Sequence, residues 1–184
     1  MESLGGVGYL LNEESQHINV SRLFRDACVG AIWEGTTDVL AGDTLRAVSH
    51  AVSGKETVRG LGWFIDTGLK TVAAGGRWKG AEVRIQEVWE GLMARVEKEG
   101  VEGLLGDARG WVFRLAEVLV AVLFMVDAVV NPGEEIEEMC RRYLVKKGFL
   151  EEGGEGRLDL AMDQAIVYGA GRVPGQEAAA GSKL

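Results

Sequence analysis

The chain has 184 residues, of which 47% are hydrophobic and 26% charged, a composition typical of a folded globular protein. Its 28 acidic residues exceed the 20 basic ones, which gives a net charge of -8 with no basic stripe, so we expect no nucleic-acid partner. Two cysteines without CxxC spacing and two histidines cannot form a structural zinc site. We therefore predict no metal site, and free thiols at Cys28 and Cys140 in a reducing compartment.

The pattern along the chain predicts an all-α fold, an antiparallel helical bundle with short glycine-containing loops. Only two prolines occur, and alternating apolar and polar runs are almost absent. Asn19 or Ser21 could cap the first helix, and Thr36 or Thr37 the second. The predicted helices cover residues 20–29, 36–52, 56–74, 81–99, 101–130, 134–148 and 158–168.

The most apolar segment, residues 111–130, is interrupted by Arg114, Glu117 and Asp127. Its longest stretch between charges is far shorter than the roughly 20 residues that a membrane-spanning helix needs. We therefore predict a helix buried on most sides and no membrane span. The opening residues MESLGGVGY lack a cationic start and an apolar region, so we expect no secretory signal.

Residues 32–40, IWEGTTDVL, place one carboxylate, Glu34, between Trp33 and Gly35. Apolar neighbours disfavour the charged form of a carboxylate and raise its pKa toward the range of a general base. Gly35 leaves room for a ligand beside the backbone, and free N–H groups at a helix start near Thr36 favour negative charge. The alternative interpretation is a glutamate in a turn ahead of a helix cap.

Three motifs follow one another in order: LGGVGY at residues 4–9, RLFRDA at 22–27 and WEGTT at 33–37, with nine residues from Arg25 to Glu34. In this order and spacing they resemble the C-terminal helical domain of the FAD-dependent acyl-CoA dehydrogenases, in the larger, alkylation-response-like branch. The resemblance is specific over residues 2–52. It implies that Glu34 takes the α-proton of an acyl-CoA thioester while FAD accepts hydride, and that the Glu34 backbone N–H holds the thioester carbonyl.

The same resemblance implies that Thr36 and Asp38 bind FAD. It also implies that Gly5 and Gly6, with Glu2 nearby, lie against the FAD of a neighbouring subunit in a homodimer or homotetramer. Glu2 stands where the family usually has glutamine, and Asp38 where it has glutamine or glutamate. Because the family's other domains have no counterpart, the chain is expected to be a C-terminal part of an enzyme and inactive alone.

The sequence divides into residues 1–150, the partial dehydrogenase domain, 151–172, a short helical extension, and 173–184, a flexible tail. The tail ends in Ser182, Lys183 and Leu184, an address read by the peroxisomal import receptor, which predicts a peroxisomal location. The Arg25–Asp26 pair is either an ordinary surface pair or, as the resemblance implies, support for the active-site wall. The alternative function is a non-catalytic helical oligomerisation or interaction module derived from such an enzyme.

Overall fold

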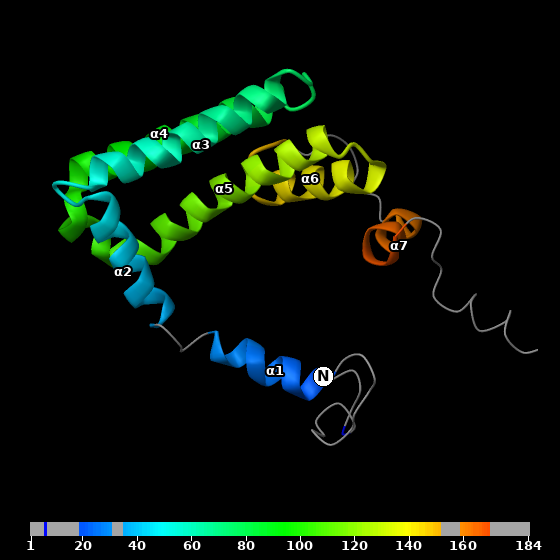
Figure 1. Ribbon diagram of the computed structural model, residues 1–184, viewed down its shortest axis with the longest axis horizontal. Helices are drawn as coiled ribbons and strands as arrows, with labels where there is room; N and C mark the ends of the chain where they lie inside the picture. Colours follow the sequence, from blue (N-terminus) through cyan, green and yellow to red (C-terminus); the bar gives the residue numbers. More distant parts are fainter. Residues whose placement is uncertain (1–5, 7–18, 31–34, 152–158, 170–184) are drawn as a thin grey trace, which may run out of the picture.

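The structure is a computed structural model that describes residues 6, 19–30, 35–151 and 159–169 (Figure 1). The all-α prediction is confirmed, since the described residues form helices and no strand. In chain order the helices are α1 (Val20–Val29), α2 (Thr37–Val48), α3 (Gly54–Ala73), α4 (Lys79–Leu104), a 3₁₀ turn (Leu105–Asp107), α5 (Ala108–Val130), α6 (Glu134–Lys146) and α7 (Leu160–Tyr168).

The apolar helix α5 forms the centre of the bundle and packs against α2, α3, α4 and α6. The helices α3 and α4 run side by side as an antiparallel pair (Figure 1). The side chains of α5 that point into the core are all almost inaccessible to solvent: Ala108, Trp111, Leu115, Val118, Ala121, Val122, Met125 and Ala128. Among the described residues no helix is both long enough and apolar enough to cross a membrane.

Close approach of α3 to α5 depends on one glycine of the helix interior. A Cβ added at Gly68 would overlap Cγ1 of Val122, which is 1% exposed on α5. By contrast, a Cβ at Gly60 or Gly91 would meet no atom within 4 Å. The glycines in these helices therefore differ in role: Gly68 permits packing, whereas Gly60 and Gly91 only weaken helix propensity.

The predicted break at position 100 is present in the structure, inside the segment assigned to α4. Gly100 does leave the helical conformation, with φ of 65°, and kinks the helix. The chain then resumes a helical turn up to Leu104, and the 3₁₀ turn separates α4 from α5. Leu104 is fully buried, so this short turn after the kink is packed into the core.

Partly buried ion pairs connect α5 with the residues at the end of α6. Glu117 accepts from Lys147 Nζ and from Arg114 NH1, both at 2.8 Å. The Arg114 guanidinium also lies 4.4 Å from the centre of the Phe149 ring. On α6, Glu138 receives hydrogen bonds from two arginines of the same helix, which lower the pKa of its carboxyl to about 2.

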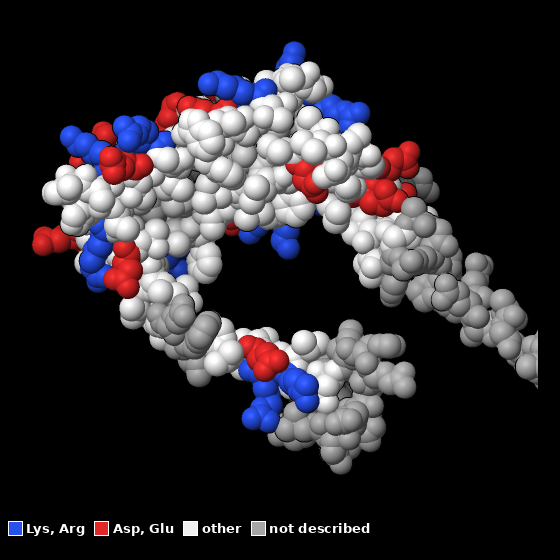
Figure 2. Space-filling view, in the orientation of Figure 1, with Lys and Arg blue, Asp and Glu red and all other residues white. Residues whose placement is uncertain are grey.

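Helix α1 is separated from the bundle in both overall views (Figures 1 and 2). The predicted cap at its start is confirmed, because the Asn19 side chain accepts from the backbone N–H of Arg22 at 2.9 Å. Helical periodicity places Leu23, Phe24 and Ala27 on one face. Leu23 is 54% exposed and Phe24 50% exposed, so the described part of the bundle leaves this apolar face uncovered.

Candidate functional site

Three of the predicted site residues, Gly35, Thr36 and Asp38, lie together at the start of α2. Gly35 has φ of 116°, a conformation that side-chain-bearing residues rarely adopt, so glycine is required there. Thr36 is the N-cap residue, and its carbonyl accepts from the Leu40 N–H at 3.0 Å. The positive φ therefore turns the chain sharply into the first turn of α2.

The N-terminal end of α2 is open to a polar ligand. The Thr36 side chain makes no capping hydrogen bond, although the cap itself was predicted at Thr36 or Thr37. In any α-helix the N–H groups of the first turn lack intrahelical acceptors and carry partial positive charge. The first turn is exposed, whereas Ala41, Leu45 and Val48 further along α2 anchor the helix in the core.

Asp38, in the first turn of α2, forms a two-pronged ion pair with Arg109 at the start of α5. Its carboxylate accepts from Arg109 Nε at 2.9 Å and from NH2 at 3.0 Å. Both side chains are more than half exposed, so the pair contributes little stability, but the fork geometry fixes their relative orientation. The pair places a guanidinium beside the start of α2, where its charge is balanced by the Asp38 carboxylate.

Arg109 is the residue of this site that sequence reasoning missed. It lies 71 positions from Asp38, and no motif or local spacing connects the two. Only the packing of α2 on α5 brings them together. The prediction that Asp38 contacts a cofactor stays a prediction, and any such contact would compete with the guanidinium.

The other predicted site residues are not assembled with α2 in the described structure. Gly6 is exposed, and a Cβ there would meet nothing within 4 Å. Glu34, Glu2 and Gly5 lie outside the described residues, as do the tail residues Ser182, Lys183 and Leu184. In the parts that are described, no cluster of three or more His, Cys, Asp or Glu side chains could hold a metal ion.

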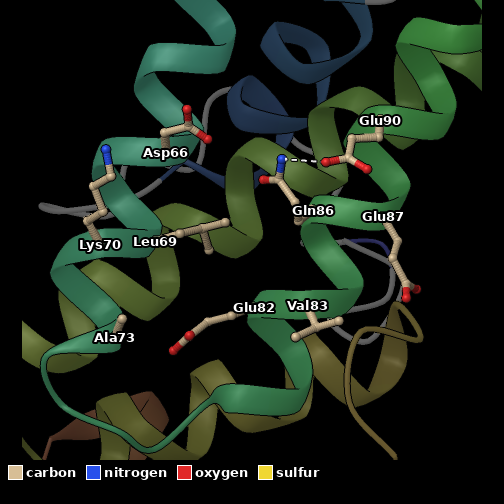
Figure 3. Close-up of a pocket in the computed structure, with 9 residues that line it drawn as sticks. All are labelled: Asp66, Leu69, Lys70, Ala73, Glu82, Val83, Gln86, Glu87 and Glu90. Carbon is tan, nitrogen blue, oxygen red and sulfur yellow. Dashed lines mark hydrogen bonds between the residues drawn. The ribbon is translucent and has the colours of Figure 1, made fainter.

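A separate groove of about 430 Å³ lies between α3 and α4 (Figure 3). Leu69, Ala73 and Val83 give it an apolar lining, while four carboxylates and one lysine surround them. Glu82 extends from α4 across the groove toward α3, and its Oε1 is enclosed without a hydrogen-bond partner. The groove is thus apolar at its base and acidic around it.

Comparison with known proteins gives no relative for this chain: no protein-family model, no curated protein and no solved structure matches it.

Proposed function

We propose that the chain is the C-terminal part of a flavin-dependent acyl-CoA dehydrogenase that removes hydrogen from Cα and Cβ of an acyl-CoA thioester. The observation that carries this proposal is the ordered series GGVGY, RDA and WEGT, which runs up to the start of a helix. The structure supports it to the extent that the glycine of WEGT adopts a positive φ and leads directly into the open end of α2.

In this mechanism Glu34 takes the α-proton, and its carboxylate becomes a carboxylic acid. The electron pair left on the α-carbon forms the new double bond as hydride leaves the β-carbon. FAD, when bound, supplies the acceptor for that hydride. Partial negative charge develops on the thioester oxygen meanwhile, and the backbone N–H of Glu34 stabilises it.

The described residues fit a polar flavin edge at the start of α2. Thr36 has a hydroxyl that makes no capping bond, and the first-turn N–H groups favour an electron-rich partner. Arg109 neutralises Asp38, so an anionic group of the cofactor would not face an uncompensated carboxylate. Gly5, Gly6 and Glu2 would face the cofactor of a neighbouring subunit.

The native protein tests this proposal through its mass and its flavin content. An antibody against the tail sequence GQEAAAGSKL would isolate it from cells, and mass spectrometry and absorbance would measure chain length and bound FAD. We expect a chain well above 19.8 kDa with FAD bound. A flavin-free chain of 19.8 kDa would contradict the proposal.

The second candidate, a non-catalytic helical interaction module, is favoured by the uncovered apolar face of α1. In such a module a partner would cover Leu23 and Phe24, which are adjacent in the chain and both about half exposed. This candidate predicts a folded, flavin-free chain that associates. A flavin-free chain that stays monomeric would count against it.

We also propose a peroxisomal location, since acyl-CoA oxidation agrees with the tail Ser182-Lys183-Leu184. A fluorescent protein fused ahead of the complete chain should appear in peroxisomes. Removal of the three residues should leave it in the cytosol, and unchanged peroxisomal fluorescence after removal would contradict the assignment.

A further inference from the structure

Helix α5 carries an apolar stripe on the side that points away from its core-facing residues. The stripe consists of Phe113, Ala116, Val120, Leu123 and Val130, which helical periodicity places on one side of the helix. Phe113 is 53% exposed, Leu123 54% and Val130 61%. A helix that is apolar on all sides is normally buried on all sides, so the stripe indicates that another segment covers it.

Helix α1 offers a surface of the same kind. Its apolar face is formed by Leu23, Phe24 and Ala27, all of which are exposed. Arg22 and Arg25 lie together on the opposite face, so both guanidinium groups stay in water when the apolar face is covered. An amphipathic helix laid against an apolar surface in this way is a common mode of recognition.

The two surfaces also match in length and in charge. The 10 residues of α1 span about 15 Å, and the stretch of α5 from Phe113 to Leu123 has the same length. Over this stretch the stripe itself contains no charged residue, because Asp127 lies beyond its end. On α1, Asp26 lies at the margin of the apolar face, where its carboxylate remains in water.

The ion pair between Asp38 and Arg109 determines where the connection to α1 begins. It joins the first turn of α2 to the first turn of α5, with N–O distances of 2.9 and 3.0 Å. Arg109 lies four residues before Phe113 and therefore on the same side of α5 as the stripe. Helix α2 thus starts beside the head of the stripe.

The connection is long enough for α1 to reach the stripe of its own chain. Eight residue steps join Val29 to Thr37, and they can span at most about 27 Å. Leu123 lies about 21 Å along α5 from Arg109, so a helix packed there with its axis about 10 Å away needs a connection of about 23 Å. At this tether length the effective concentration of α1 near the stripe is in the millimolar range, which favours the same chain over a second copy.

We propose that α1 closes onto its own chain and lies along α5, with Leu23 and Phe24 packed against the stripe between Phe113 and Leu123. In Figure 1 α1 lies apart from α5, so closure requires a movement of α1 about its connection to α2. Closure holds the connection that carries Glu34 at both ends. It also uses the face that an interaction module would offer to a partner, so the two ideas are alternatives. The inference does not depend on bound flavin.

Disulfide trapping in the full 184-residue chain tests the closed arrangement. The native Cys28 is exposed and lies at the margin of the α1 apolar face, whereas Cys140 is buried. Three single variants place a second thiol along the stripe: Ala116→Cys, Val120→Cys and Leu123→Cys. The control Glu97→Cys places it at an exposed position of α4.

After addition of oxidised glutathione, a non-reducing gel and peptide mass mapping measure how fast Cys28 joins the new cysteine. We expect at least one stripe variant to form this disulfide within a single chain at least about tenfold faster than the Glu97→Cys control.

Two matched pairs of changes on α1 separate docking from chance collision. Leu23→Ser with Phe24→Ser removes the apolar contact, and Arg22→Ser with Arg25→Ser changes the opposite face of the same helix. We expect the first pair to slow the fastest disulfide at least about tenfold and the second to leave its rate unchanged. Circular dichroism checks that both pairs keep the helix content of the unaltered chain.

Three results would overturn the proposal. In the first, no stripe variant forms the disulfide faster than Glu97→Cys. In the second, both pairs of changes on α1 slow the disulfide equally. In the third, the Cys28 disulfides join two chains into a product of about twice 19.8 kDa, because a second copy then covers the stripe.

Discussion

Replacement of Gly68 by alanine tests whether α3 and α5 pack as closely as the structure shows. The added methyl group would overlap Cγ1 of Val122 and lie 3.5 Å from Cγ2 of Val126. Val122 cannot easily turn away, because a β-branched side chain in a helix has one strongly preferred rotamer and this one is 1% exposed. The helices must therefore separate or strain.

The magnitude follows from two opposing terms. Overpacking a core costs about 1–3 kcal/mol, while alanine gains about 1 kcal/mol of helix propensity over glycine. Gly60→Ala on the same helix meets no atom within 4 Å, so it isolates the propensity gain. We expect Gly68→Ala to be about 1–3 kcal/mol less stable than Gly60→Ala.

Urea unfolding followed by circular dichroism measures this difference. The double variant Gly68→Ala with Val122→Ala should be less destabilised than the sum of its single variants, because removing Cγ1 removes the overlap. If Gly68→Ala is as stable as Gly60→Ala, the close contact between α3 and α5 is wrong.

Three further outcomes follow from the charges and thiols of the described residues. Cys28 is exposed, whereas burial raises the pKa of the Cys140 thiol to about 12. Iodoacetamide should therefore modify only Cys28 before the chain unfolds, and peptide mass mapping would show which cysteine is labelled. Rapid labelling of Cys140 in the folded chain would contradict this. The folded-state pKa of Glu138, about 2, lies below its ordinary 4.5, so its stabilisation is present above about pH 4.5 and is lost as the pH falls toward 2. The difference in melting temperature between the unaltered chain and Glu138→Gln should therefore shrink over that range, and a difference independent of pH would refute the assignment. Arg109→Ala should change the free energy of unfolding by less than about 1 kcal/mol, because its pair with Asp38 is exposed, and a loss of several times that amount would show that the pair is structural.

Local patterns in the sequence were sufficient to predict the helices, but not to predict which residues of different helices contact each other. The cap at Asn19, the core role of α5 and the start of α2 at Thr36 each depend on residues adjacent in sequence, and the structure agrees with them. The break at position 100 was also predicted correctly, since Gly100 leaves the helical conformation, but the short helical turn that follows it up to the buried Leu104 was not separated from α5 in the prediction. Helix α2 also ends at Val48, before the predicted residue 52.

Some parts of the candidate site could likewise be predicted from local sequence, and others could not. Gly35 and Thr36 were identified from a short motif, and their backbone geometry is local. Arg109 and the α3–α4 groove could not be predicted, because both arise where helices distant in sequence pack together. No pattern of spacing within one segment contains that information.

The most direct test of the dehydrogenase proposal is reduction of the bound flavin by acyl-CoA in the native protein that contains this chain, with and without Glu34→Gln. Oxidised-flavin absorbance is followed without oxygen after addition of a panel of acyl-CoA thioesters, and Glu97→Gln is the matched control. We expect at least one thioester to bleach the flavin of the unaltered protein and of the control, while Glu34→Gln keeps its flavin but is not bleached. Bleaching that persists in Glu34→Gln would contradict the assignment of Glu34 as the base.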